Sequence, residues 1–182
     1  MSSTTLRTIE IVAYDPRWPA IFAELSRVVA RALGPLALSI EHVGSTSVPG
    51  LAAKPIVDMD VVIASRSLLP DVLLALAPLG YIHQGDLGIA GREALVHEGA
   101  DVPRDGSGRV WPAHHLYVCA QDNAELARHL ALRGYLRAHP ESALAYGELK
   151  RRLARQFPHD IEAYIEGKAA FIQGILDLAQ GK

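Results

Sequence analysis

His42-Val-Gly-Ser-Thr-Ser-Val-Pro-Gly-Leu-Ala-Ala-Lys-Pro-Ile-Val-Asp-Met-Asp-Val-Val-Ile63 is the stretch that decides the fold of this chain. A turn at Gly44-Ser45 follows one apolar run, and Asp58 and Asp60 lie inside a second. Residues two apart in a strand point to the same face. The two carboxylates are therefore expected to project side by side while their apolar neighbours pack beneath them. Carboxylates that close repel each other unless a cation lies between them. The pattern therefore indicates a chemically active site.

Length and composition predict an ordinary globular protein. The 182 residues fit one domain, with a core of residues 8–120 and a helical extension of residues 121–180. The net charge of -2 argues against a dedicated nucleic-acid binder. Residues 1–10 lack the pattern of a signal peptide, and the most apolar long stretch, residues 68–82, is too short and broken to span a bilayer. We therefore expect a cytoplasmic protein without membrane contact.

The order of the elements predicts the fold class. Strands are expected at residues 8–12, 36–43, 56–64, 81–83, 92–98 and 114–119, and helices at residues 16–33, 68–79, 122–138, 140–156 and 160–179. Asp15 and Asp160 are suitable helix caps. Strands and helices mix in the first two thirds, and the last third is helical only. This order predicts an α+β fold, with a mixed β-sheet flanked by helices and a C-terminal helical extension.

The Asp pair has a functional and a plain interpretation. Phosphoryl and nucleotidyl transfer use a divalent metal to neutralise developing charge, and Mg2+ accepts one or two carboxylates while keeping positions for water and phosphate. The plain interpretation is a strand end whose acids face water. Both acids lie within an otherwise apolar run, residues 55–63, where acids need a partner. That position favours the functional interpretation.

The Gly44-Ser45 turn is suited to an anion. Glycine lets backbone N–H groups approach a phosphate closely, and the serine hydroxyl adds a donor. Alone, the same turn is also the ordinary end of a strand. Its combination with two acids on the next strand is the stronger signal.

These motifs resemble the nucleotidyltransferase (DNA polymerase β-like) superfamily. Further segments resemble the GrpB family, also called UPF0157, within it: residues 14–19, 41–58, 114–118 and 133–140. The resemblance covers residues 8 to 175 and implies a nucleotidyltransferase fold. It implies that Gly44 and Ser45 contact phosphates and that Asp58 and Asp60 hold Mg2+ or Mn2+.

The resemblance also implies a third carboxylate on a later strand, which this chain lacks. The best-placed strand, residues 114–119, has no acid, so His115 is the candidate replacement as base or metal ligand. A structural role for His115 is the alternative. Glu93 and Glu98, on the preceding strand, are weaker candidates for the missing acid.

Basic residues are needed beside an anionic substrate. Lys54 and Arg92 are expected to bind the nucleotide phosphates at the site, because their neighbours in sequence already lie near it. The cluster at residues 150–155 is expected to be a solvated helix face, and Cys119 a buried small hydrophobe.

Three hypotheses follow. The first is a metal-dependent nucleotidyltransferase that moves a nucleotidyl group from a nucleoside triphosphate to a small-molecule acceptor. The second is a non-catalytic binding domain for a nucleotide or phosphorylated metabolite, supported by the absent third acid. In the third, Asp58 and Asp60 are structural and pair only with Lys54 or Arg92.

Overall fold

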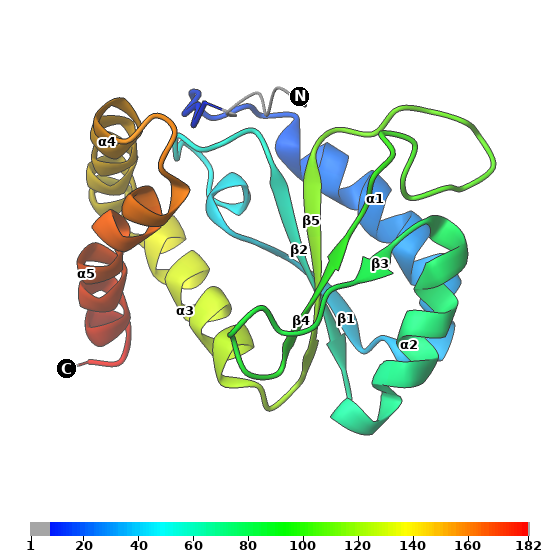
Figure 1. The fold of residues 1–182 in the computed structure, drawn as a ribbon. Coiled ribbons are helices and arrows are strands. Elements are labelled where there is room, and N and C mark those ends of the chain that lie inside the picture. Colours follow the sequence, from blue (N-terminus) through cyan, green and yellow to red (C-terminus); the bar gives the residue numbers. More distant parts are fainter. Residues whose placement is uncertain (1–7, 182) are drawn as a thin grey trace.

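A five-stranded mixed sheet forms the centre of the computed structural model (Figure 1). The model describes residues 8–181; residues 1–7, most of the segment considered for a signal peptide, and residue 182 lie outside it. The strands are β1 (Ser39–Val43), β2 (Val57–Ile63), β3 (Ile82–His83), β4 (Arg92–Val96) and β5 (His114–Ala120). Their order across the sheet is β1-β2-β5-β4-β3. Only β2 and β5 are parallel; every other neighbouring pair is antiparallel.

Helices cover both faces of this sheet. They are α1 (Trp18–Leu33), α2 (Leu69–Leu76), α3 (Ala124–Ala138), α4 (Pro140–Gln156) and α5 (Ile161–Ala179). Figure 1 shows α1 and α2 on one side of the sheet and α3, α4 and α5 on the other. The expected α+β class, with its mixed sheet and C-terminal helices, is confirmed. None of these helices, which all lie within residues 8–181, has the length and apolar character to cross a membrane.

Strand alternation separates a packing face from a polar face. Val57, Met59 and Val61 of β2 are buried in the core beneath α1 and α2. Asp58 and Asp60 therefore face α3, because alternate residues of a strand point to opposite faces. The same alternation on β5 turns His115 and Tyr117 toward α3. Cys119 also points there and is buried, as expected, against Val62 and Leu126.

A second hydrophobic cluster joins the loop after the Gly-Ser turn to the C-terminal helices. Val48 and Leu51 of that loop pack with Leu136 of α3, Tyr146 of α4 and Ile175 of α5. The extension therefore closes over the loop that carries Ser45, rather than standing apart from it.

Several boundaries differ from the sequence-based expectations. The strand expected at residues 8–12 is a single bridge between Val12 and Ala53, since the nearby Pro55 has no N–H to extend a ladder. Helix α1 begins at Trp18 because the Asp15 carboxylate bonds the Arg17 backbone and guanidinium instead of capping the helix. Asn123 caps α3 through the N–H groups of residues 125 and 126. Asp160 caps α5 as expected.

Candidate functional site

A cavity of about 470 Å³ lies between the polar face of the sheet and the C-terminal helices. Six of the seven site residues expected from sequence line it: Gly44, Ser45, Lys54, Asp58, Arg92 and His115. The seventh, Asp60, does not. The cavity thus brings together residues from the turn after β1, from strands β2, β4 and β5, and from the C-terminal helices.

The Gly44 backbone brings the turn against the Asp58 carboxylate. Gly44 has φ +70°, a conformation that L side chains rarely adopt, and a Cβ at this position would collide with the Asp58 carboxylate. Ser45 to Ser47 then form a 3₁₀ turn, and the Ser47 hydroxyl donates to the Gly44 carbonyl at 2.6 Å. The turn therefore presents the Ser45 hydroxyl beside Asp58 in the cavity.

His115 is the direct partner of Asp58. It lies opposite Asp58 in the β2–β5 register, and its Nδ1 is 2.8 Å from Asp58 Oδ1. The His115 side chain is 46% exposed and that of Asp58 is 28% exposed. Both side chains are therefore open to a ligand in the cavity.

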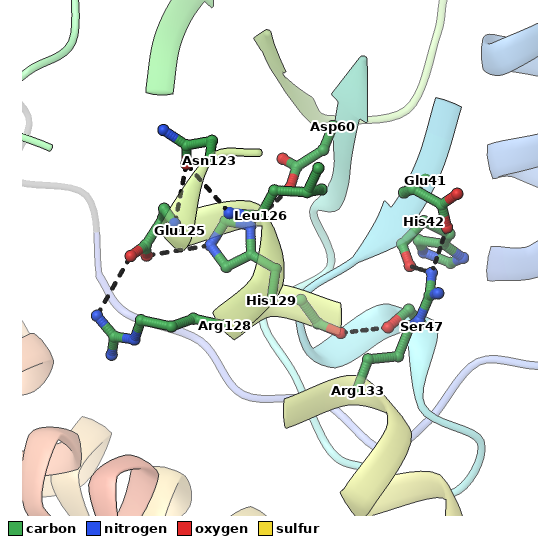
Figure 2. Close-up of polar contacts among 11 residues, drawn as sticks. Glu41, His42, Ser47, Asp60, Asn123, Glu125, Leu126, Arg128, His129 and Arg133 are labelled. Carbon is green, nitrogen blue, oxygen red and sulfur yellow. Dashed lines mark hydrogen bonds and ion pairs between the residues drawn. The ribbon is translucent and has the colours of Figure 1, made fainter. Parts of the chain in front are cut away.

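Asp60 lies beneath the cavity and is fully buried. Its Oδ2 accepts a hydrogen bond from His129 Nδ1 of α3 at 2.6 Å (Figure 2). Its Oδ1 has no hydrogen-bond partner within the described part of the chain. Burial alone would lower the pKa of His129, but the hydrogen bond and charge of Asp60, with the charge of Glu125, raise it. The raised pKa favours the protonated form of His129, which would offset the buried charge of Asp60. The two carboxylates expected to be open therefore differ. Asp58 is partly exposed in the cavity, and Asp60 is buried against His129.

The structure corrects the other expectations for acids. Opposite Asp60, β5 carries Tyr117 rather than a carboxylate. Glu93 is buried and held by Arg66 and His83, and neither it nor the exposed Glu98 lines the cavity. Within residues 8–181, Asp58 and Asp60 pair with histidines, not with Lys54 or Arg92 as the structural hypothesis requires.

Three lysines form one end of the cavity wall: Lys54 before β2, Lys150 of α4 and Lys168 of α5. Lys150 is only 2% exposed, and its Nζ donates to Ser45 Oγ at 2.7 Å. Burial, aided by the charge of Lys168, lowers the pKa of Lys150 to about 7. Burial, aided by the charge of Lys54, lowers the pKa of Lys168 to about 8. An anion bound between lysines that lower one another's pKa would stabilise their charged forms.

Lys150 was wrongly expected on a solvated helix face. The buried positions of α4 are Ala143, Tyr146, Gly147, Lys150, Leu153 and Ala154. This is the three-four spacing of an inward-facing stripe, and Lys150 lies in it. That spacing was the available signal. His129 was also missed, although it precedes Arg133 by four residues and so shares its helix face.

Two arginines of α3 fix the Gly-Ser turn. Arg133 donates to Glu41 Oε2 at 3.0 Å and to the His42 carbonyl at 2.8 Å (Figure 2). Arg137 donates twice to the Ser47 carbonyl, at 2.9 and 2.7 Å. These bonds hold the turn from both sides, so its geometry depends on the docking of α3.

Comparison with known proteins identifies relatives along nearly the whole chain. The GrpB protein family model matches residues 8–178. UPF0157 protein YqkA of Bacillus subtilis is 37% identical over 167 residues, which are 92% of this chain and 46% of YqkA. This chain therefore spans less than half the length of that relative.

One solved structure agrees on the family. The crystal structure of the conserved protein GrpB from Enterococcus faecalis has a TM-score of 0.79 and 36% identity, covering 94% of this chain and 98% of that one. A crystal structure of the Cid1 poly(U) polymerase is more distant, with a TM-score of 0.49 and 15% identity over 81% of this chain and 44% of that one. That distant similarity carries no conclusion about activity. The family match and the E. faecalis structure together show that this chain belongs to the GrpB family.

Proposed function

We propose that this protein is a metal-dependent nucleotidyltransferase that uses a nucleoside triphosphate and a small-molecule acceptor. The observation that carries the proposal is the meeting of Ser45, Asp58 and three lysines in one cavity. None of the lysines forms an ion pair with a carboxylate of residues 8–181. A triphosphate supplies the negative charge that such a cluster favours.

The acids fit a divalent cation. Asp58 is open to the cavity. Asp60 is buried beneath it, and its Oδ1 has no hydrogen-bond partner among residues 8–181. Each acid therefore has an oxygen that could bind Mg2+ or Mn2+. No group of three or more His, Cys, Asp or Glu side chains in the described part of the chain is arranged to hold a metal. Two carboxylates, completed by water and substrate phosphates, are nevertheless a usual Mg2+ set. Asp58 and Asp60 would hold the ion, which would neutralise charge on the transferred group.

The reaction assigns a role to His115. A hydroxyl, amine or phosphate oxygen of the acceptor attacks the α-phosphorus, and the bond to the pyrophosphate leaving group breaks. In this proposal His115, oriented by Asp58, takes the proton from an acceptor hydroxyl or amine. Lys54, Lys150 and Lys168 bind the pyrophosphate oxygens, with Gly44 and Ser45 as the adjoining phosphate contacts.

A non-catalytic nucleotide-binding domain is the second candidate. Tyr117 faces Asp60 where a third carboxylate would lie, and His129 occupies one Asp60 oxygen. Both observations favour retention of the pocket without turnover.

Pyrophosphate release separates the two candidates. Purified protein with Mg2+ and each of the four ribonucleoside triphosphates is assayed against a panel of hydroxyl, amine and phosphate acceptors. We expect release that Asp58→Asn abolishes and that the exposed Asp122→Asn leaves unchanged. Nucleotide binding without release across the panel would select the binding domain. Absence of nucleotide binding would reject both.

A further inference from the structure

The cavity has a second charged end, built differently from the lysine end. Beyond Asp58 and His115 its wall is formed by Tyr117 of β5, Arg92 of β4, and Ile89 in the loop before β4, with Glu125 and Arg128 of α3. We call this part the arginine end. It lies on the β5–β4 side of Asp58, whereas the Gly44 turn follows β1, on the other side of β2.

Arg92 is the unusual residue of the arginine end. Its guanidinium carbon lies 4.4 Å from the centre of the Tyr117 ring, stacked over it. Within residues 8–181, Arg92 forms no ion pair with a carboxylate, and its buried Nε has no hydrogen-bond partner. The other arginines of the cavity are occupied: Arg128 pairs with Glu125, and Arg133 with Glu41.

An arginine in this condition is suited to an anionic ligand. A buried donor without a partner costs free energy that a ligand oxygen restores. The planar guanidinium matches a carboxylate or phosphate with two parallel hydrogen bonds, and the ring beneath it fixes its plane. Tyr117 therefore orients the Arg92 guanidinium to bind a carboxylate or phosphate.

The direction of transfer gives this end its role. In phosphoryl transfer the attacking and leaving oxygens lie roughly in line on opposite sides of the phosphorus. If pyrophosphate leaves toward the lysine end, the acceptor attacks from the side of β5 and β4. His115 and Arg92 lie on that side.

We propose that the arginine end binds the acceptor, and that the acceptor is a small molecule carrying a phosphate or carboxylate group held by Arg92 on the Tyr117 ring. This inference rests on the proposed nucleotidyl transfer and adds the chemical class of its second substrate. Arg92 positions the acceptor; the proton transfer stays with His115.

The test uses inorganic phosphate and acetate as probes. Each is titrated into the full chain saturated with Mg2+ and a non-hydrolysable ATP analogue, while backbone amide NMR shifts follow residues 89–92 and 117. We expect a saturable second site whose affinity falls at least about tenfold in Arg92→Gln. Arg92→Lys keeps the positive charge but loses the planar guanidinium, so its affinity for the probe is expected to lie between those of wild type and Arg92→Gln. The tighter probe identifies the group as phosphate or carboxylate.

The controls separate this inference from the proposed function. Arg155→Gln, on the exposed face of α4, should leave both affinities unchanged, and Arg92→Gln should leave the affinity for the analogue unchanged. Equal phosphate affinity in wild type, Arg92→Gln and Arg92→Lys overturns the inference while leaving nucleotide binding intact. If none of the non-hydrolysable analogues of the four ribonucleoside triphosphates binds wild type, the proposed function fails. The same titration without nucleotide then decides whether Arg92 binds an oxyanion. If Arg92→Gln does not fold, Arg92→Lys alone decides.

Discussion

At the residue scale, the site depends on close pairs made by residues distant in sequence. Asp58 is held by His115, Asp60 by His129 and Ser45 by Lys150. Each pair joins the segment 44–60 to a later element. The pKa of His129 is raised and that of Lys150 is lowered by their surroundings, so the protonation of these two partners depends on how α3 and α4 pack.

Gly44 offers a test of the contact between the turn and Asp58. Gly44→Ala forces both a left-handed backbone and a collision with the Asp58 carboxylate, whereas Gly50→Ala, at φ +80° with open space around it, forces only the backbone. Gly50→Ala should cost about 1–2 kcal/mol and leave ligand affinity intact. Gly44→Ala should cost more, and should weaken Mg2+–nucleotide affinity at least about tenfold, a loss of ~1.4 kcal/mol. Denaturant unfolding and calorimetry measure the two effects. Equal behaviour of the variants would show that Gly44 is only a turn residue.

At the element scale, α3 positions the site as well as covering the sheet. It supplies His129 to Asp60, Arg133 to the β1 end and Arg137 to Ser47. The Gly-Ser turn is short and has few backbone bonds of its own, from the N–H groups of Ser47 and Val48. Its rigidity is therefore supplied by the helix.

Arg137→Met tests that dependence. Losing both bonds leaves the carbonyl of the buried Ser47 poorly satisfied, at a cost of ~1–3 kcal/mol. Hydrogen exchange of the Ser47 and Val48 amides should become faster, while exchange in the β2–β5 ladder stays unchanged. Arg155→Met on exposed α4 is the matched control. Unchanged exchange at the turn would contradict the account.

Some elements were predictable from local signals, and others were not. Pro140, Gly34 and Asp160 mark helix boundaries through backbone chemistry that acts within a few residues. Such signals placed α4 correctly, and the alternation of β2 placed its two faces. The strand expected at residues 8–12 failed because a ladder needs a partner, and partners are decided by tertiary structure.

At the scale of the whole molecule, the two faces of the sheet have different roles. The face beneath α1 and α2 holds the main core, and the face beneath α3, α4 and α5 holds the cavity. Sequence alone identified six residues that line the cavity, and they are Gly44, Ser45, Lys54, Asp58, Arg92 and His115. It missed Lys150 and His129. The spacing of α4 places Lys150 on the buried face of that helix, but the residues that this face meets depend on how the helix docks on the sheet.

The buried Lys150 is expected to lower the stability of the ligand-free protein while strengthening nucleotide binding. Its pKa in the folded protein, about 7, is below the unfolded value of 10.5, so the unfolded state holds more protons between those values. The stability of the ligand-free protein should therefore rise from pH 7 toward pH 10.5 on account of this group. Lys150→Met removes the penalty, which is fully present below pH 7.

Thermal unfolding across pH measures this effect. We expect the ligand-free Lys150→Met protein to melt about 2–4 °C higher than wild type at pH 6, the shift that ~1 kcal/mol gives at this size, and its advantage to shrink as pH rises toward 10.5. Lys150→Met should also weaken nucleotide binding. A lower melting temperature at pH 6 would mean that the Ser45 hydrogen bond outweighs the buried charge.

The central claim is that this cavity binds a nucleoside triphosphate together with a divalent cation at Asp58. Isothermal titration of each Mg2+–nucleoside triphosphate into wild type, Asp58→Asn, Lys150→Met and the control Asp122→Asn tests it most directly. The account predicts one saturable site in wild type and Asp122→Asn, weakened at least about tenfold in each of the other two variants, a loss of ~1.4 kcal/mol or more. No binding by wild type, or equal binding by all four proteins, would contradict it.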